Sequence, residues 1–435
     1  MKTRPAVVHP RHADLDQLDA LLSLHNPQAV KYDDEELARS VVQTLAARPP
    51  LVASRDVDRL TAALDSVRAG KAIALQLGDC AERFGDASPA SVRARVQLFL
   101  RAGRLLSKLM ACPAVVIGRF AGQFGKPRSA LHESAPGEVG LPTYRGDIIN
   151  DPAADITART PDPARMLRAY DAAATSIALA DGVLPSSGLA SGSRGLARVG
   201  AALFTSHELL LLPFEWGMTR RVLPAGTRYD LSAHFLWIGD RTRSPDGAHV
   251  ALARDIANPI GVKLGPATTT DELLRLLRVL NPKNRPGRIT LITRLGASRV
   301  DQELPCLIEA VHRAAATVLW GCDPLHGNTE TTSRGRKTRR FAQVLHELEQ
   351  TIVLHARHGS SLSLLHLEAT PERVTECLGG PGPAQDASDL LQCYRSACDP
   401  RLNDLQLLGL IEQVSASLGP LWQASRAELR ARRPP

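Results

Sequence analysis

The chain has 435 residues, of which 44% are apolar and 23% charged, with 32 Gly and 30 Pro. This composition is that of an ordinary globular protein, and it excludes a disordered, collagen-like or membrane-spanning chain. No uninterrupted apolar stretch approaches the roughly 18 residues of a transmembrane helix, and residues 1–16 lack the apolar core of a secretion signal. The seven Cys residues have no short paired spacing, so we expect a reduced, cytoplasmic protein without membrane association.

The charge balance is basic, with 53 Lys and Arg against 45 Asp and Glu and a net charge of +8. The densest basic cluster consists of Arg334, Arg336, Lys337, Arg339 and Arg340. Because no aromatic side chain lies inside it, we interpret the cluster as a solvated helix start and expect no nucleic-acid partner. Small anionic substrates such as phosphates and carboxylates better explain buried Arg and Lys residues.

The first 70 residues show helical periodicity, because leucines and valines recur every three or four positions from Leu15 to Val67. The pattern changes after Gly70, where residues 72–77 form a short apolar run typical of a buried parallel strand. We therefore predict a helical extension at 1–70, a core domain at 71–420 and a basic tail at 421–435.

Short apolar runs, most of them separated by amphipathic stretches, continue through the core domain. The runs cover residues 72–77, 114–119, 201–208, 234–241, 261–265, 289–296, 317–327 and 362–370. The amphipathic stretches include residues 163–179, 270–280, 302–315 and 338–354. Eight strands alternating with helices predict an α/β fold of the (β/α)8 TIM-barrel type, whose active site lies at the carboxyl ends of the strands.

Ionisable residues close these runs, as an active site at that end of a barrel requires. They are Cys80, Arg119, His207 with Glu208, Asp240 with Arg241, Lys263, Arg294, His326 and Glu368. Cys80, His326 and Glu368, together with Asp399 beyond the last strand, make a mixed set of sulfur, nitrogen and oxygen ligands. Such a set suits Mn, Co, Fe or Zn. Each residue alone also has a common structural explanation, since buried Cys and hydrogen-bonded His are frequent in cores.

The remaining ring residues are cations that need an anionic ligand. Arg119, Lys126, Arg128, Arg241, Lys263 and Arg294 would meet at one mouth of the barrel. A substrate with both a phosphate and a carboxylate, and a phosphorylated second substrate, would account for so many positive charges. Salt bridges with Asp79, Glu82 and Asp240 are expected to engage one or two of them.

Several long motifs identify a family. They are QLGDCAERF, RFAGQFGKPRS, LPTYRGDIIN, FTSHE, YDLSAHFLWIGDRTR, DGAHVALARDIANPIGVKLGP, WGCDPLHGNTETTSRGRKTRRF, VTECLGG and CDPRLN, spread collinearly from about residue 30 to about residue 410. The chain resembles class-II 3-deoxy-D-arabino-heptulosonate 7-phosphate (DAHP) synthases. The resemblance implies a TIM barrel that condenses phosphoenolpyruvate with erythrose 4-phosphate, using a divalent metal, at the first step of the shikimate pathway. Mn is the expected metal, with Co or Zn as alternatives.

The resemblance also implies roles for individual residues. The metal ligands are expected to be Cys80, His326, Glu368 and Asp399. The contacts to phosphoenolpyruvate are expected from Arg119, Arg241, Lys263 and Arg294, with Asp240 and Trp237 beside them, and those to the aldose phosphate from Lys126, Arg128 and Ser129. Lys263 is the candidate proton donor or relay, and catalytic roles also fall to Arg119, Cys80 and His326. We expect a homodimer or tetramer, and a chorismate-mutase-type enzyme as a candidate partner.

The sequence departs from the family pattern at several places. Leu77 replaces a Gly, Asp240 replaces a longer Glu, and residues 130–141 differ beside the aldose-phosphate contacts. This leaves two alternatives open: the same condensation on an amino or imino aldose phosphate of an aminoshikimate-type route, or a catalytically idle paralogue that binds a partner.

Two further expectations concern regulation. Residues 186–200 are rich in Gly and Ser where regulated members have a helical pair that forms an aromatic effector site, so we expect a short, insensitive subtype serving secondary metabolism. Cys398 precedes Asp399 and is expected near Cys80, where a disulfide would remove a metal ligand; we expect both thiols to stay reduced.

Overall fold

Eight parallel strands form a closed barrel in the computed structural model, which describes residues 13–130, 132–133, 140–184 and 202–431. The strands are β1 (Ile73–Gly78), β2 (Ala114–Arg119), β5 (Phe204–Glu208), β8 (Phe235–Ile238), β9 (Ile260–Leu264), β10 (Ile289–Thr293), β11 (Leu319–Cys322) and β14 (Leu362–Glu368). Each strand pairs with the next one in this series, and β14 returns to β1. The predicted (β/α)8 barrel is confirmed, and each strand lies within one residue of, or inside, its apolar run.

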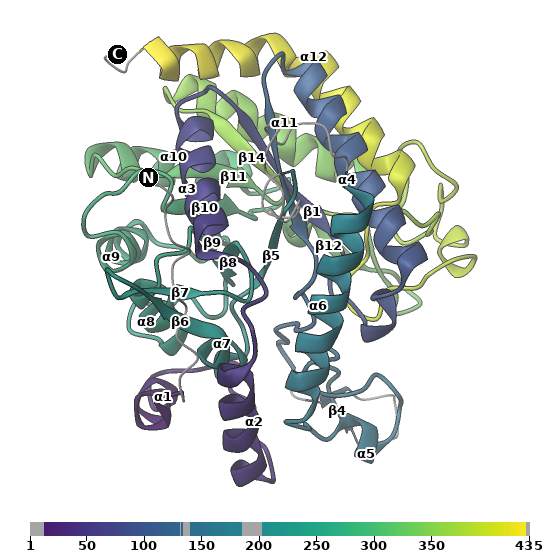
Figure 1. The fold of residues 1–435 in the computed structure, drawn as a ribbon. Helices are drawn as coiled ribbons and strands as arrows, with labels where there is room; N and C mark the ends of the chain where they lie inside the picture. The colour runs from purple at the N-terminus through teal and green to yellow at the C-terminus, as the bar shows by residue number, and fades with distance from the viewer. Residues whose placement is uncertain (1–12, 131, 134–139, 185–201, 432–435) are drawn as a thin grey trace.

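Helices connect the strands and cover the outside of the barrel (Figure 1). They are α4 (Pro89–Leu109), α6 (Arg165–Val183), α7 (Leu212–Met218), α8 (Ala248–Asp255), α9 (Thr270–Leu280), α10 (Val300–Arg313), α11 (Phe341–Arg357) and α12 (Asp404–Ala431). The short helix α5 (Ile156–Arg159) lies beside the hairpin strand β4. Leucines spaced three and four apart give α9 one apolar face, which is buried through Leu273, Leu276, Leu277 and Leu280. The helix occupies the predicted range 270–280.

The amino-terminal helices are α1 (Leu15–Leu22), α2 (Glu35–Ala47) and α3 (Ser54–Arg68). Leu60 and Leu64 of α3 pack in one buried cluster with barrel residues such as Phe235. Gly287, just before β10, lies against the backbone of Thr61, where a side chain would collide with the carbonyl oxygen at 2.2 Å. The third helix therefore closes the amino ends of the strands, and the opposite end remains for the site.

Short elements lie at both ends of the barrel. Those at the carboxyl ends of the strands are the hairpins β3 (His132–Glu133) with β4 (Leu141–Pro142) and β12 (Thr329–Thr331) with β13 (Lys337–Arg339), and the 3-10 turns η1 (Phe84–Asp86), η2 (His326–Asn328) and η3 (Asp389–Leu391). The hairpin β6 (Thr219–Val222) with β7 (Thr227–Asp230) lies at the amino ends, where the Tyr229 hydroxyl donates to Asp58 of α3 at 2.9 Å.

The interpretation of the basic cluster as a solvated helix start is wrong, because Lys337 and Arg339 belong to β13 and α11 begins only at Phe341. Arg339 is fully buried against Glu368, with 2.8 Å between Nη1 and Oε2. The segment is a strand because it pairs with β12, and the buried ion pair anchors its end to the barrel.

The last helix runs through the expected domain boundary at residue 421. Trp422 is fully buried and donates from Nε1 to the carbonyl of Leu362 at 2.7 Å, and Arg426 donates to the carbonyl of Gly70 at 3.1 Å. Residues 421–431 thus pack on the barrel. Among the described residues, no helix combines the length and the apolar character needed to cross a membrane.

Candidate active site

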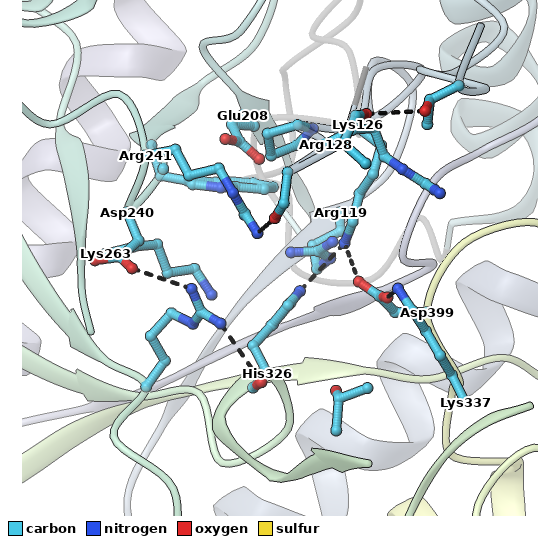
Figure 2. A pocket seen from close by; sticks show the side chains of 18 of the residues that line it. Arg119, Lys126, Arg128, Glu208, Asp240, Arg241, Lys263, His326, Lys337 and Asp399 are labelled. Carbon is cyan, nitrogen blue, oxygen red and sulfur yellow. Dashed lines mark hydrogen bonds and ion pairs between the residues drawn. The ribbon is translucent and has the colours of Figure 1, made fainter. Parts of the chain in front are cut away.

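A cavity of about 330 Å³ opens at the carboxyl ends of the strands. Figure 2 shows cationic side chains from several strands gathered around it. The predicted site residues that line it are Arg119, Lys126, Arg128, Ser129, Trp237, Asp240, Arg241, Lys263, Arg294, His326 and Asp399. Cys80 and Glu368 lie beneath the lining and are almost fully buried. The structure therefore brings the predicted residues together, although their positions span most of the chain.

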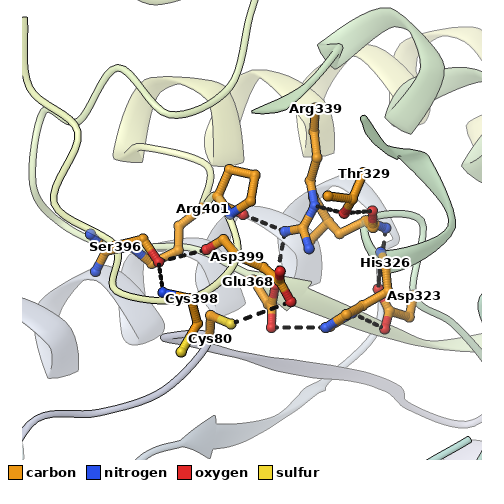
Figure 3. A network of polar contacts seen from close by, with 12 residues as sticks. Cys80, Asp323, His326, Thr329, Arg339, Glu368, Ser396, Cys398, Asp399 and Arg401 are labelled. Atoms are coloured by element: carbon orange, nitrogen blue, oxygen red, sulfur yellow. Dashed lines mark hydrogen bonds and ion pairs between the residues drawn. The ribbon is translucent and has the colours of Figure 1, made fainter. Parts of the chain in front are cut away.

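The four predicted metal ligands converge on one cation, the ammonium of Lys126. Its Nζ lies 2.9 Å from Cys80 Sγ, 2.9 Å from Asp399 Oδ2, 3.2 Å from His326 Nε2 and 3.7 Å from Glu368 Oε1. Figure 3 shows the side chains of the four predicted ligands, from loops and strand ends, around the same point. Residues separated by more than 300 positions therefore direct a thiol, an imidazole and two carboxylates at one place.

The donor set fits a divalent transition ion. Within the described ranges, no three His, Cys, Asp or Glu side chains have the mutual spacing of a metal centre, and the Lys126 ammonium lies among the four predicted ligands. Burial alone would raise the pKa of Glu368, but His326, Lys126 and Arg339 hold it well below its usual range. The pKa of Asp399 is likewise held low against burial, chiefly by Lys126. Two ionised carboxylates with sulfur and imidazole nitrogen suit such an ion.

Asp323 is a site residue that the sequence analysis missed. Its Oδ2 contacts Lys263 Nζ and lies 2.6 Å from His326 Nδ1, while its Oδ1 accepts from the backbone of Leu325 and His326 at 3.1 and 3.2 Å. Burial would raise the pKa of this carboxyl, but His326 and Lys263 hold it well below its usual range. One ionised carboxylate thus orients both a predicted metal ligand and the predicted proton donor. Its position directly after β11, at the carboxyl end of a barrel strand, could have identified it as a site residue.

Lys263 projects from β9 into the cavity with only 4% of its surface exposed. The pKa of its ammonium is lowered to about 8, because burial, Arg119 and Arg294 together lower it by more than Asp323 raises it. A proton donor works best when its pKa is near the working pH. The environment of Lys263 is therefore compatible with the proton-donor role expected from the resemblance.

Arg119 joins the cation-rich wall to the predicted metal ligands. Its Nη2 donates to Glu368 Oε1 at 3.0 Å and to the Cys80 carbonyl at 3.1 Å. Its guanidinium carbon lies 4.8 Å from the ring centre of Trp237, which also lines the cavity. Such stacking holds the guanidinium plane in a fixed orientation.

Asp240 accounts for the salt bridges expected among the cavity cations. It accepts from Arg294 Nη1 at 3.2 Å and from Arg243 Nε at 3.0 Å. Asp79 and Glu82 instead face Arg95, which does not line the cavity, at 2.8 and 3.7 Å. The expectation that these two acids engage cavity cations is therefore wrong, because Asp79 pairs with Arg95 and Arg401 and Glu82 with Arg95, outside the cavity lining.

The side chains of His207 and Glu208, at the end of β5, point to opposite sides of the strand, because successive side chains alternate along a strand. Glu208 lines the cavity, and its Oε1 is buried without a hydrogen-bond partner. Burial raises the pKa of this carboxyl although Lys126 and Lys263 lower it. His207 faces away and contacts Glu215 Oε1 at 3.0 Å. The sequence analysis named both residues as strand-end residues, but only Glu208 lines the cavity. Glu133 and Lys337 also line the cavity and were not predicted as site residues.

Two expectations about regulation stay predictions. Residues 186–200, on which the short subtype depends, lie outside the described residues. Cys398 packs against Cys80 and Tyr144, and both thiols are free. Burial raises the pKa of the Cys80 thiol well above its usual range. Independence of activity from added reductant would exclude a redox role for this pair.

A closed (β/α)8 barrel with a cation-lined cavity and a converging ligand set defines a barrel enzyme for anionic substrates. The sequence pattern described as the class-II DAHP synthetase family matches residues 17–199 and 185–415, and the chain belongs to this family.

Curated relatives agree with this assignment. The phospho-2-dehydro-3-deoxyheptonate aldolase AroG of Mycolicibacterium smegmatis is 40% identical over 92% of this chain and 94% of its own length. A phospho-2-dehydro-3-deoxyheptonate aldolase of Streptomyces coelicolor is 41% identical over 88% of this chain and 93% of its own length. An enzyme of the same name from Neurospora crassa is 40% identical over 88% of this chain and 90% of its own length. A solved DAHP synthase from Thermotoga maritima, in truncated form, aligns with a TM-score of 0.34 and 13% identity over 81% of this chain and 88% of its own. That likeness is too slight to add to the assignment.

Proposed function

We propose that this cavity condenses phosphoenolpyruvate with erythrose 4-phosphate and water to give DAHP and phosphate, the reaction of a 3-deoxy-7-phosphoheptulonate synthase. Membership of the family supports this activity, which opens the shikimate pathway. The observation that carries the assignment to these residues is the convergence of Cys80, His326, Glu368 and Asp399 on one cation beside the cation-lined cavity.

The family is generally metal-dependent, and we assign the metal to these four residues with Mn as the ion, Co and Zn being alternatives. When bound, the metal supplies Lewis-acid polarisation of the aldehyde. The Lys126 ammonium contacts all four ligands, and two cations repel each other at such short range. The ion would therefore be held by these four residues without Lys126, and we assign the lysine ammonium to the aldose phosphate.

Arg119, Arg241, Lys263 and Arg294 are our candidates for holding phosphoenolpyruvate. Guanidinium groups pair bidentately with phosphate and carboxylate. Asp240 fixes Arg294, and Trp237 fixes Arg119 by stacking. These cations meet the phosphoryl oxygens while phosphate leaves, and stabilise the charge that develops there.

Lys126, Arg128 and Ser129 are our candidates for the aldose phosphate. The hydroxyl of Ser129 accepts from Arg241 Nη2, which links this subsite to the phosphoenolpyruvate subsite. Holding two substrates in register provides a large part of the rate enhancement of a condensation. Lys263 carries the proton that the reaction needs, and its pKa of about 8 keeps it mostly protonated at neutral pH.

A single assay tests the proposal. The purified protein is mixed with phosphoenolpyruvate, erythrose 4-phosphate and Mn, and loss of enol-phosphate absorbance is followed with and without chelator. Chelator-sensitive consumption is expected. Consumption only with an amino or imino analogue would favour the aminoshikimate-type alternative, and no consumption with any aldose phosphate would favour an idle, partner-binding paralogue.

The finer biological assignments are also proposals. A homodimer or tetramer, a chorismate-mutase-type partner, a cytoplasmic location and a role in secondary metabolism agree with the family. The free state of all seven Cys residues is compatible with a reducing compartment. Light scattering of the purified protein, alone and with a chorismate mutase, tests the assembly.

A further inference from the structure

An acidic side chain stands in the cavity wall beside the proposed aldose-phosphate subsite. Glu133 of β3 lines the cavity, and its Oε1 accepts from Arg128 Nη2 at 3.1 Å. Its other oxygen, Oε2, accepts from Arg159 Nη1 at 3.0 Å. One carboxylate therefore bridges two guanidinium groups, one of which we assign to the substrate.

The outer partner of Glu133 is fixed. The side chain of Arg159 is 8% exposed, and its nitrogens also donate to the carbonyls of Ala153, Pro142 and Pro152 at 2.9, 3.1 and 3.0 Å. The backbone N–H of Tyr144 donates to Glu133 Oε1 at 3.3 Å. Glu133 itself is 41% exposed, so it reaches the cavity while remaining tied to a rigid part of the protein.

The backbone of Arg128 is fixed from a different direction. Its N–H donates to Gln28 Oε1 at 3.0 Å, and Gln28 Nε2 donates back to its carbonyl at 3.1 Å. Gln28 is buried. With the main chain held by Gln28 and the guanidinium by Glu133, Arg128 has lost much of the rotamer freedom that an arginine normally gives up on binding.

The charge of this wall stays favourable for a phosphate. Glu133 lies between two guanidinium groups, so the three side chains together carry one net positive charge. The carboxylate therefore orients Arg128 without making the wall repel an anion. A carboxylate that accepts a hydrogen bond from a ligand-binding arginine can fix the orientation of its guanidinium.

We propose that Glu133 is a positioning residue for the aldose phosphate, acting through Arg128, and thereby a determinant of aldehyde specificity. The inference rests on the proposed function, because it assumes that Arg128 binds this substrate. Glu133 belongs to residues 130–141, the segment that we expect to depart from the family pattern next to these contacts.

The test is a kinetic comparison of Glu133→Gln with the wild type. Gln keeps the size but not the charge, so Arg128 loses a charge-assisted hydrogen bond. We expect the KM for erythrose 4-phosphate to rise roughly five- to tenfold, with kcat and the KM for phosphoenolpyruvate unchanged. The matched control is Glu372→Gln, which removes an exposed carboxylate 3.1 Å from Arg395 and away from the cavity. It should leave all three constants unchanged.

A double-mutant cycle identifies the route of the effect. If Glu133 acts through Arg128, Glu133→Gln has no further effect on the KM for erythrose 4-phosphate in an Arg128→Met background. Additive effects would overturn the inference, and so would an unchanged or lowered KM, or an equal rise for both substrates, in a Glu133→Gln protein with wild-type melting temperature. A wild-type protein that makes no DAHP would refute the proposed function instead.

Discussion

Replacing Asp323 by Asn separates the two tasks that we assign to this carboxylate. The amide keeps the size of the side chain, and its oxygen can still accept from the backbone N–H groups of Leu325 and His326. The other position becomes an amide N–H, which cannot accept from His326 Nδ1 or from the Lys263 ammonium. The variant should fold, while the imidazole and the lysine both lose their partner.

The size of the effect follows from known behaviour of such carboxylates. Loss of a group that orients a ligating His costs about 10- to 100-fold in metal affinity. Asp323 also raises the pKa of Lys263, which is about 8 with this carboxylate in place because burial lowers it. Without it the pKa falls further, so less of the lysine is protonated at neutral pH. We therefore expect weaker Mn binding together with a lower kcat.

Calorimetric titration with Mn and a steady-state DAHP assay measure the two effects. The matched control is Asp56→Asn, since Asp56 is also nearly buried and pairs with Arg59 at 3.1 Å, but lies on α3 at the other end of the barrel. An Asp323→Asn protein with wild-type melting temperature, unchanged Mn affinity and unchanged kcat would refute the reasoning.

The remaining predictions test the site and the packing around it. Activity that needs protonated Lys263 should fall as the pH rises through about 8; a flat kcat/KM–pH profile there would contradict this role. Gly122→Ala should destabilise the protein by about 1–3 kcal/mol in urea unfolding, because the new Cβ would lie 2.3 Å from His207 Nδ1, and an unchanged midpoint would show that the histidine moves freely. Trp422→Ala should cost about 3–5 kcal/mol because the indole is fully buried; a small loss would mean that the end of α12 is dispensable. Phe, Trp and Tyr, added singly and together, should leave the rate unchanged, whereas synergistic inhibition would end the prediction of an insensitive subtype.

Much of the barrel was predictable because its strands are short, fully buried and followed by ionisable residues. Arg119, Lys263 and Glu368 each lie on a strand at the carboxyl end, where parallel strands meet in one mouth. Periodicity alone placed α9, since its leucines form one face. These features depend on neighbours in sequence or on the alternation of strands and helices, which a single sequence contains.

The parts that escaped prediction depend on distant partners. Arg339 lies in a strand that pairs with β12, and its guanidinium meets Glu368 of a distant strand. Asp323 has two roles because Lys263 and His326 approach it from separate segments. The contact of Lys126 with all four predicted metal ligands likewise exists only in the folded barrel. Local sequence patterns carry no information about contacts between residues that are distant in sequence.

The most direct test of the proposed site asks whether a bound metal has sulfur from Cys80 in its coordination sphere. Cobalt bound to a thiolate gives a sulfur-to-metal charge-transfer band in the near-ultraviolet, which oxygen and nitrogen ligands do not give. We predict this band in the cobalt-loaded wild type and in Cys398→Ser, and its loss in Cys80→Ser. A cobalt-loaded wild type without the band, or a Cys80→Ser protein that retains it, would contradict the assignment of the four ligands.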